Sequence, residues 1–102
     1  MNILVIDTSD SSNIKVGLRV NNQEYKINQK MKRAQVVLRL IDKLLTKHKL
    51  SIYDLNKIKV NTGPGSFTGL RVSISIANAL GFFLKIPING KKVGELAHPK
   101  YK

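Results

Sequence analysis

Apolar and polar residues follow a strand-like pattern over the first 30 positions. Ile3-Leu4-Val5-Ile6 is a continuous apolar run, which is typical of a strand covered on both faces. Apolar residues then alternate with polar ones over residues 14–20, and again at Tyr25 and Ile27, which is the period of a half-buried strand. Asn21-Asn22 predicts a two-residue hairpin turn between them, because Asn tolerates positive φ. The pattern predicts a meander of three strands.

The period changes to that of a helix between residues 32 and 49, where apolar side chains recur at helical spacing. Ser51 and Asp54 then have the spacing of a capping box for one short turn. A fourth strand is expected at residues 57–60, and a second helix from Ser66 to about Phe83.

A fifth short strand is expected at Ile88-Asn89, so the fourth strand, second helix and fifth strand form a β-α-β unit with parallel strands. This order predicts one α/β domain over residues 1–102, a ribonuclease-H-like lobe with a mixed five-stranded sheet and two main helices. Residues from about 90 to 102 are expected to form a partly loose, basic tail.

The composition limits the class of protein. At 102 residues, with 42% hydrophobic and 24% charged side chains, the chain is expected to form one soluble domain with a small core. It has no cysteine, which excludes disulfides and cysteine-based sites. Its apolar runs fall short of the roughly 20 residues of a membrane span, and no signal peptide is visible at Met1. We therefore expect a cytoplasmic location and no membrane association.

The formal charge of +12 leaves two interpretations open. A basic surface can attract RNA, including tRNA, or an acidic protein. Lysines far outnumber arginines, however, and arginine is the usual bidentate reader of phosphate and guanine. The lysines are equally well explained as residues that keep the chain soluble.

The segment NTGPGSFTGLR at 61–71 links the fourth strand to the second helix. Its glycines match neither the P-loop, which needs a lysine after the last glycine, nor the spacing of a dinucleotide site. Free N–H groups at the helix start can hold an anion. The favoured interpretation is a structural turn in which glycines adopt the required φ angles and Ser66 or Thr68 caps the helix. The turn consists of Gly63, Pro64, Gly65, Ser66 and Gly69.

Asp7-Thr8-Ser9 follows the first strand and admits three interpretations. Such a strand end can hold a metal–nucleotide complex, or supply the first carboxylate of a two-metal nuclease. A nuclease is disfavoured, because Asp42 and Asp54 fall on a helix and in a connector rather than at strand ends. The third interpretation is that these side chains bond the turn backbone. His48 and His98 lack metal-ligand spacing, so no metal site is expected.

Small residues recur every four positions along the second helix, at Gly69, Ser73, Ala77 and Gly81. A stripe of small side chains lets another helix approach closely. We expect this stripe, with part of the first helix, to face a second subunit, while the side with larger residues covers the sheet. That side consists of Val72, Ile76, Ala79 and Phe83. A bulky charge at Ala77 is then expected to abolish pairing without unfolding the chain.

Several segments resemble the TsaB (YeaZ) family. ILVIDTS at 3–9 is similar to the family's opening strand and turn, and GPGSFTGLR at 63–71, followed by VSISIANALG, to its most distinctive segment. SIYDLNKI at 51–58 and IPINGKKVGEL at 86–96 fit the same frame. The resemblance covers nearly all of this chain but only the first lobe of a usual member, so the family's second lobe is expected to be absent.

The resemblance implies a lobe of the actin/Hsp70-like ATPase superfamily. It implies a non-catalytic scaffold subunit of the bacterial machinery that makes N6-threonylcarbamoyladenosine (t6A) beside the anticodon of tRNAs that read codons beginning with A. Members pair through the two helices of the first lobe with the catalytic subunit TsaD, which carries the metal, or with a second copy. TsaE is an ATPase that joins them.

The resemblance implies no cofactor bound by this chain alone. Contact of Asp7, Thr8 and Ser9 with ATP or ADP would need a partner to complete the cleft. Two alternatives stay open: a nucleotide-binding enzyme of the same superfamily, and a small basic tRNA-binding module.

The chain departs from the family pattern at Arg33, where members often have His, and at Ser73, which replaces a frequent glycine. Partner contacts are expected from both helices. The expected contact residues are Arg33, Val37, Leu40, Leu70, Arg71, Ser73, Ile74, Ala77, Asn78 and Gly81.

Overall fold

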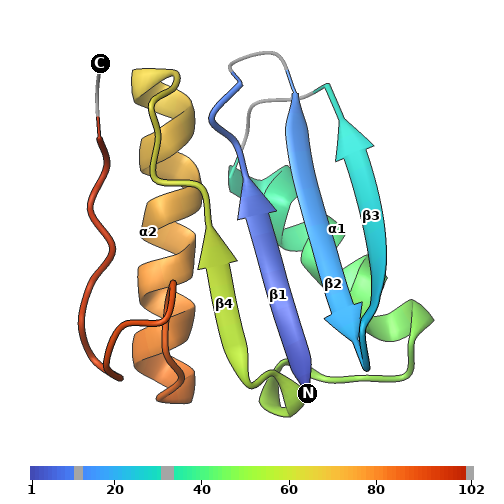
Figure 1. Ribbon diagram of the computed structural model, residues 1–102. Coiled ribbons are helices and arrows are strands. Elements are labelled where there is room, and N and C mark those ends of the chain that lie inside the picture. Colours follow the sequence, from blue (N-terminus) through green and yellow to red (C-terminus); the bar gives the residue numbers. More distant parts are fainter. Residues whose placement is uncertain (11–12, 31–33, 101–102) are drawn as a thin grey trace.

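The computed structural model describes residues 1–10, 13–30 and 34–100, which form a four-stranded sheet packed against two helices (Figure 1). The strands are β1 (Asn2–Asp7), β2 (Ile14–Val20), β3 (Gln23–Gln29) and β4 (Lys57–Val60), in the order β3-β2-β1-β4. β1 pairs antiparallel with β2 and parallel with β4, and β2 pairs antiparallel with β3. The sheet is therefore mixed, as the element order predicts.

Two local predictions are confirmed at the ends of elements. The β2–β3 hairpin turns at Asn21 and Asn22, whose φ angles are 49° and 71°, as a two-residue turn of this kind requires. The helices are α1 (Ala34–Lys47), η1 (Ile52–Asp54, a short 3₁₀ helix) and α2 (Phe67–Leu84). Both bonds of the capping box are present at η1, where the Ser51 amide donates to Asp54 Oδ2 at 2.8 Å.

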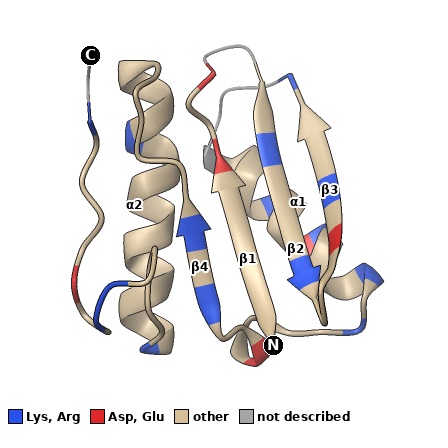
Figure 2. Cartoon of the chain, in the orientation of Figure 1, with Lys and Arg blue, Asp and Glu red and all other residues tan. Residues whose placement is uncertain are grey.

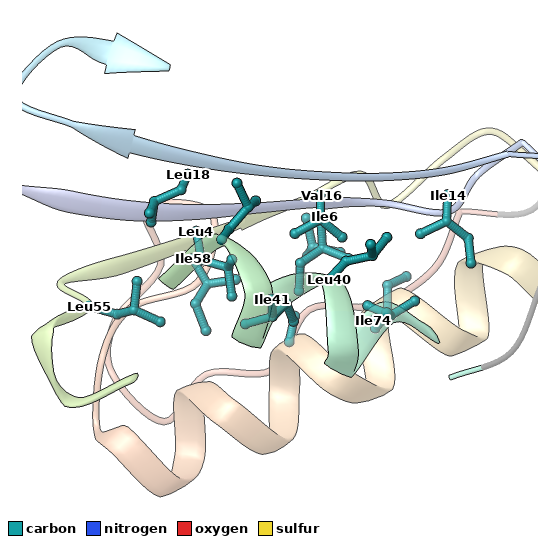
Figure 3. Close-up of a cluster of buried hydrophobic side chains, with 14 of the residues drawn as sticks. Leu4, Ile6, Ile14, Val16, Leu18, Leu40, Ile41, Leu55, Ile58 and Ile74 are labelled. Atoms are coloured by element: carbon teal, nitrogen blue, oxygen red, sulfur yellow. The ribbon is translucent and has the colours of Figure 1, made fainter. Parts of the chain in front are cut away.

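The hydrophobic core lies between one face of the sheet and the two helices (Figure 3). The sheet contributes alternate residues of three strands: Leu4, Ile6, Ile14, Val16, Leu18, Ile58 and Val60. The helices contribute residues at helical spacing: Val36, Val37, Leu40, Ile41, Leu44 and Leu45 from α1, and Leu70, Ile74 and Ala77 from α2. The side chains predicted at strand spacing and those predicted at helical spacing therefore pack together in one core.

The other face of the sheet has no cover in the part of the chain that the structure describes. α1 passes behind β1, β2 and β3 in Figure 1, and no element lies in front of these strands. Ile3 and Val5, which point to this face, are half-buried, whereas Leu4 and Ile6 are fully buried on the helix side. The prediction that the apolar run of β1 is covered on both faces is thus wrong for the described residues.

The expected fifth strand is wrong as well, because it is reduced to one parallel bridge between Ile58 and Ile88. The φ angle of the next residue, Asn89, is 53°, which turns the chain away from the extended conformation. The Asn89 side chain instead accepts from the Val60 N–H at 2.9 Å and donates to the Val60 carbonyl at 3.0 Å. One amide side chain thereby replaces the backbone partners of a longer strand.

Residues 90–100 contain no helix or strand and run beside α2 (Figure 1). The Asn78 side chain donates to the Ala97 carbonyl at 3.0 Å and accepts from the Ala97 N–H at 2.8 Å. The Lys100 N–H donates to the Thr62 carbonyl at 2.7 Å. Ala97 is buried, so this described part of the tail packs on one flank of α2.

Candidate interaction surface

The polar residues at the carboxyl end of β1 bond to one another. Asp7 Oδ1 accepts hydrogen bonds from the Ser9 N–H at 2.9 Å and from the Ser9 hydroxyl at 2.6 Å. The Asn61 side chain, just after β4, donates to Asp7 Oδ2 at 3.2 Å and to Ser9 Oγ at 3.1 Å. The arrangement ties the ends of two neighbouring parallel strands together.

The pKa of Asp7 lies below its usual value. Partial burial by itself would raise the pKa, since it disfavours the charged form. The hydrogen bonds from the Ser9 hydroxyl and backbone and from Asn61, together with the charge of Lys15, outweigh burial and lower the pKa. Ionised Asp7 is therefore a stabilising structural group.

The glycine-rich segment is a tight corner between β4 and α2. Ser66 caps α2, with its hydroxyl accepting from the Gly69 N–H at 3.2 Å. The turn after β1 packs directly on this corner, since a Cβ on Gly69 would lie 1.9 Å from the Thr8 carbonyl oxygen, and one on Gly65 would lie 2.7 Å from Ser9 Cβ. Glycine is needed at both positions because backbone fills the space.

Polar groups at the start of α2 also form hydrogen bonds with the turn after β1. The Ser66 N–H donates to the Ser9 carbonyl at 2.7 Å, and the Thr8 hydroxyl donates to the Gly69 carbonyl. The Ser66 N–H and the Thr8 hydroxyl, which could otherwise bind a phosphate, are therefore hydrogen-bonded within the fold. Contact of Asp7, Thr8 and Ser9 with ATP or ADP across a partner interface stays a prediction, and the bonding among them gives it no support.

Histidines and carboxylates do not form a metal site in residues 1–10, 13–30 and 34–100, where no group of three or more such side chains could hold an ion. Asp54 caps η1, and Asp42 is exposed on α1. His98 is exposed as predicted, whereas His48 is half-buried, with its ring centroid 4.0 Å from that of Tyr25.

Most of the predicted partner-contact residues lie in the core of this chain. Val37, Leu40, Leu70, Ser73, Ile74, Ala77 and Gly81 are buried. Arg71 is exposed, and Asn78 is half-buried with its side-chain amide bonded to the tail. Arg33 falls outside the described residues. Ala77 has no exposed surface, so the expectation that a bulky charge there leaves the chain folded is corrected.

The two faces of α2 are the reverse of the sequence-based assignment. The small residues face this chain's own fold: Ser73 and Ala77 are fully buried, and a Cβ on Gly81 would lie 2.6 Å from Ile88 Cδ1. The side with the larger residues is only partly exposed, since Val72 and Ile76 pack against the edge of the core. We call Val72, Ile76, Ala79 and Phe83 the α2 outer face; Val72 and Ile76 are half-buried, and Ala79 and Phe83 are exposed.

Exposed aromatic residues extend the α2 outer face at its carboxyl end. Phe83 is 62% exposed and Phe82 76%, and the ring of Tyr53 in η1, itself exposed, has its centroid 6.2 Å from that of Phe83. The sequence analysis missed Tyr53 and Phe82. The adjacent Phe82-Phe83 pair gave no decisive signal, because neighbours on a helix point about 100° apart and can both be buried in one core, as Leu44 and Leu45 of α1 are.

The apolar surface of α2 is large for a helix of this size. By length and composition its 18 residues could cross a membrane, so the prediction that every apolar run is too short does not hold for α2. Only 28% of those residues are buried, while Leu70, Ile74 and Ala77 among them form part of the core against the sheet. An apolar helix with a buried inner face and an exposed outer face fits a protein–protein contact.

Comparison with known proteins gives one consistent set of relatives. A family model described as "TsaD: tRNA N6-adenosine threonylcarbamoyltransferase" matches residues 25–91. The chain is 39% identical over 90 residues to "tRNA threonylcarbamoyladenosine biosynthesis protein TsaB" of Buchnera aphidicola subsp. Schizaphis graminum, covering 86% of this chain and 42% of that protein. It is 34% identical over 94 residues to the Bacillus subtilis protein of the same name, covering 87% and 40%.

The fold agrees with the sequence relatives. The solved structure "YeaZ from Pseudomonas aeruginosa" superposes with a TM-score of 0.80 at 28% identity, covering 85% of this chain and 41% of that one. The match supports the ribonuclease-H-like lobe, with four strands in place of the five expected. The chain thus spans about 40% of the length of the relatives it matches.

Proposed function

Because the chain belongs to the TsaB (YeaZ) family, which it matches over a single lobe, we propose that it is a non-catalytic partner subunit in the biosynthesis of t6A in tRNA. It docks through α2 on a TsaD-like catalytic subunit and holds that subunit in an active form. A TsaE-like ATPase and the tRNA join through the complex, in the cytoplasm.

The observation that carries this proposal is the α2 outer face, together with the aromatic residues beside it. Phe82, Phe83 and Tyr53 are more than half exposed, and such side chains are the usual anchors of protein interfaces. The family model that matches this chain is that of the transferase, so a TsaD-like partner has a similar lobe and offers a similar helix. Helix-against-helix docking of two related lobes follows from this likeness.

A supporting role without catalysis agrees with the chemistry at the strand ends. Asp7, Ser9, Asn61 and Thr8 hold the corner together and have their hydrogen bonds within the chain. The threonylcarbamoyl transfer is then the work of the partner. No step of this proposal passes through a nucleotide or metal held by this chain.

The test is reconstitution with the TsaD homologue of the same organism. The two proteins are co-purified, and threonylcarbamoyl transfer to tRNA is measured with and without this chain, with TsaE present. The proposal predicts a stable complex and transfer that depends on the chain. Transfer at the same rate without the chain, or a failure to co-purify, contradicts it.

Two binding measurements separate the alternatives from the proposal. A nucleotide-dependent enzyme requires calorimetric binding of ATP and Mg²⁺ by the isolated chain. A basic tRNA-binding module requires tight binding of tRNA by the isolated chain, with an affinity that falls steeply with salt. Light scattering of the isolated chain shows whether the α2 outer face pairs with a second copy when no partner is present.

A further inference from the structure

The uncovered face of the sheet is an ordered array of side chains, set by the strand register. One row across the strands is Lys26, Gly17, Val5 and Lys59. The row nearer the amino end of β1 is Glu24, Arg19, Ile3 and Lys57, and the row nearer its carboxyl end is Asn28, Lys15, Asp7 and Asn61. We call these residues the open face. Its centre is small and apolar, with cationic residues on both sides.

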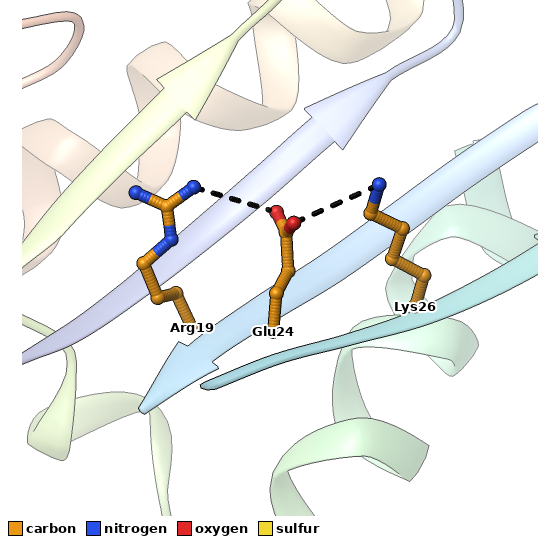
Figure 4. Close-up of polar contacts among 3 residues, drawn as sticks. All are labelled: Arg19, Glu24 and Lys26. Carbon is orange, nitrogen blue, oxygen red and sulfur yellow. Dashed lines mark ion pairs between the residues drawn. The ribbon is translucent and has the colours of Figure 1, made fainter. Parts of the chain in front are cut away.

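On the open face, basic residues of β2 and β3 lie close to acidic residues, whereas those of β4 do not. Glu24 lies 3.7 Å from Arg19 and 3.6 Å from Lys26, and the three form a small network on β2 and β3 (Figure 4). Lys15 interacts with Asp7 across β1 and β2. Lys57 and Lys59 on β4 have no ion pair among the described residues. Among the strands, Figure 2 shows basic segments on β2, β3 and β4 and acidic segments on β1 and β3.

The surface beside Val5 is hollowed on both sides. One hollow of about 230 Å³ is lined by residues that include Val5, Gly17 and Lys26, and another of about 380 Å³ by residues that include Val5 and Lys59. A glycine within a strand weakens it and often marks a place where another segment approaches closely. Gly17 is buried by its neighbours, but this chain's own packing does not require a glycine there, because a Cβ would make ordinary contacts, the nearest at 3.4 Å from Val5 Cβ.

We propose that the open face binds an amphipathic helix of a partner protein, with its apolar stripe over Ile3 and Val5 beside Gly17 and acidic residues on the flank that faces Lys57 and Lys59. A sheet is normally covered on both faces, and the apolar run of β1 has the composition of a strand with two covered faces. A helix is about 10 Å wide, and the four strands span roughly 14 Å, so a helix centred on β1 brings an acidic flank within reach of Lys57 and Lys59 on β4.

RNA fits this surface less well than a helix does. Sheets that bind single-stranded RNA stack bases on aromatic side chains, and no residue of the open face is aromatic. A phosphate backbone also gains nothing from an apolar centre between two basic margins, whereas an amphipathic helix matches both. The surface is separate from the α2 outer face, since the helices pack on the opposite side of the sheet.

The probe is a fluorescein-labelled helical peptide of about 18 residues, with a Leu/Ala stripe flanked by Glu. Two control peptides have the same residues in scrambled order, or Lys in place of Glu. Binding to the 102-residue chain is followed by anisotropy at low and high salt, and the contact residues are located from amide shifts in NMR spectra. We expect binding of the acidic peptide that weakens with salt, with shifts confined to β1, β2 and β4.

Two variants test the charges and the hollow. The double variant Lys57→Glu with Lys59→Glu is expected to bind the acidic peptide about tenfold more weakly and the Lys-flanked peptide more tightly. Its matched control is Lys43→Glu with Lys47→Glu, an equal charge change on exposed positions of α1. Gly17→Val is expected to block the peptide while the chain stays folded, because β-branched residues suit strands.

Each contrary result overturns the proposal. The proposal is wrong if the acidic peptide does not bind, or if the scrambled peptide binds equally well. It is also wrong if the α1 control variant weakens binding as much as the β4 variant does. Displacement of the peptide by tRNA, with the same amides shifted, would assign the surface to nucleic acid instead. Phe83→Glu is expected to leave peptide binding unchanged, so this test is independent of docking through α2.

Discussion

The hydroxyl of Thr8, after β1, donates a hydrogen bond to the carbonyl of Gly69 in the first turn of α2. Thr8 is 3% exposed, and a Cβ on Gly69 would lie 1.9 Å from the Thr8 carbonyl oxygen. The two backbones touch with no side chain between them. This contact sets the position of α2 on the sheet, and with it the direction of the α2 outer face.

Gly69→Ala is expected to destabilise the chain by about 2–3 kcal/mol, because the added methyl group forces the two backbones apart. The measurement is urea unfolding followed by circular dichroism. Gly17→Ala is the control, since a Cβ there meets only ordinary contacts. Equal stability of the two variants would show that the Thr8–Gly69 contact is not tight.

Asp7 is expected to make stability depend on pH in the acid range. Its pKa is lower in the folded chain than in the unfolded one, so the ionised carboxylate stabilises the fold above the unfolded value of about 3.9. That contribution is lost as the pH falls through the lower, folded pKa. Asp7→Asn should therefore lower stability at pH 7, because the hydrogen bonds from Ser9 and Asn61 are weakened, and flatten the loss of stability below about pH 4.

The check is a series of thermal unfolding curves from pH 7 to pH 3. Asp42→Asn, which removes the same charge from an exposed position on α1, is the matched control. Parallel profiles for the native chain and Asp7→Asn would contradict the role given to the Asp7 carboxylate.

Asn78→Ala should release the tail from α2, because both hydrogen bonds to the Ala97 backbone are lost. We expect faster amide exchange at residues 97–100 and a loss of stability of about 1–2 kcal/mol. Ser75→Ala, exposed on the same helix, is the matched variant and should exchange as the native chain does. Unchanged exchange in Asn78→Ala would mean that other contacts hold the tail.

Ala77→Glu and Ala79→Glu place the same charge two residues apart on α2, with opposite expected results. Ala77 is fully buried, so Glu there should unfold the chain by leaving a charge in the core, at a cost of about 3 kcal/mol or more. Ala79 is exposed on the α2 outer face, so Glu there should leave the fold intact and weaken docking. Circular dichroism separates the two, and a folded Ala77→Glu chain would refute the assignment of the inner face.

The sequence predicted those elements whose signals are local. The continuous apolar run located β1, alternation located β2 and β3, Asn21-Asn22 located the hairpin turn, and the spacing of Ser51 and Asp54 located the capping box. Each depends on residues close together in the chain, so no knowledge of tertiary contacts was needed.

The fifth strand failed because its end is decided by a long-range contact. Ile88 has strand-like character, but the Asn89 side chain bonds to the backbone of Val60, far away in the sequence, and the chain turns away. Short apolar runs cannot reveal such a competition between side chain and backbone.

The candidate surface was reversed for a related reason. A stripe of small residues on a helix shows where something approaches closely, but not whether it is the chain's own sheet or a second molecule. Gly81 and Ala77 face Ile88 and the core, whereas Phe82 and Phe83 of the same helix are exposed.

The most direct test is a calorimetric titration of the TsaD homologue of the same organism with the native chain, Phe83→Glu and Val93→Glu. Phe83 and Val93 are exposed to similar extents, 62% and 55%, but Val93 belongs to the tail and not to α2. Docking through α2 predicts binding by the native chain and Val93→Glu, and affinity at least about tenfold lower for Phe83→Glu with an unchanged circular dichroism spectrum. Equal affinity of all three, or no binding by the native chain, would contradict it.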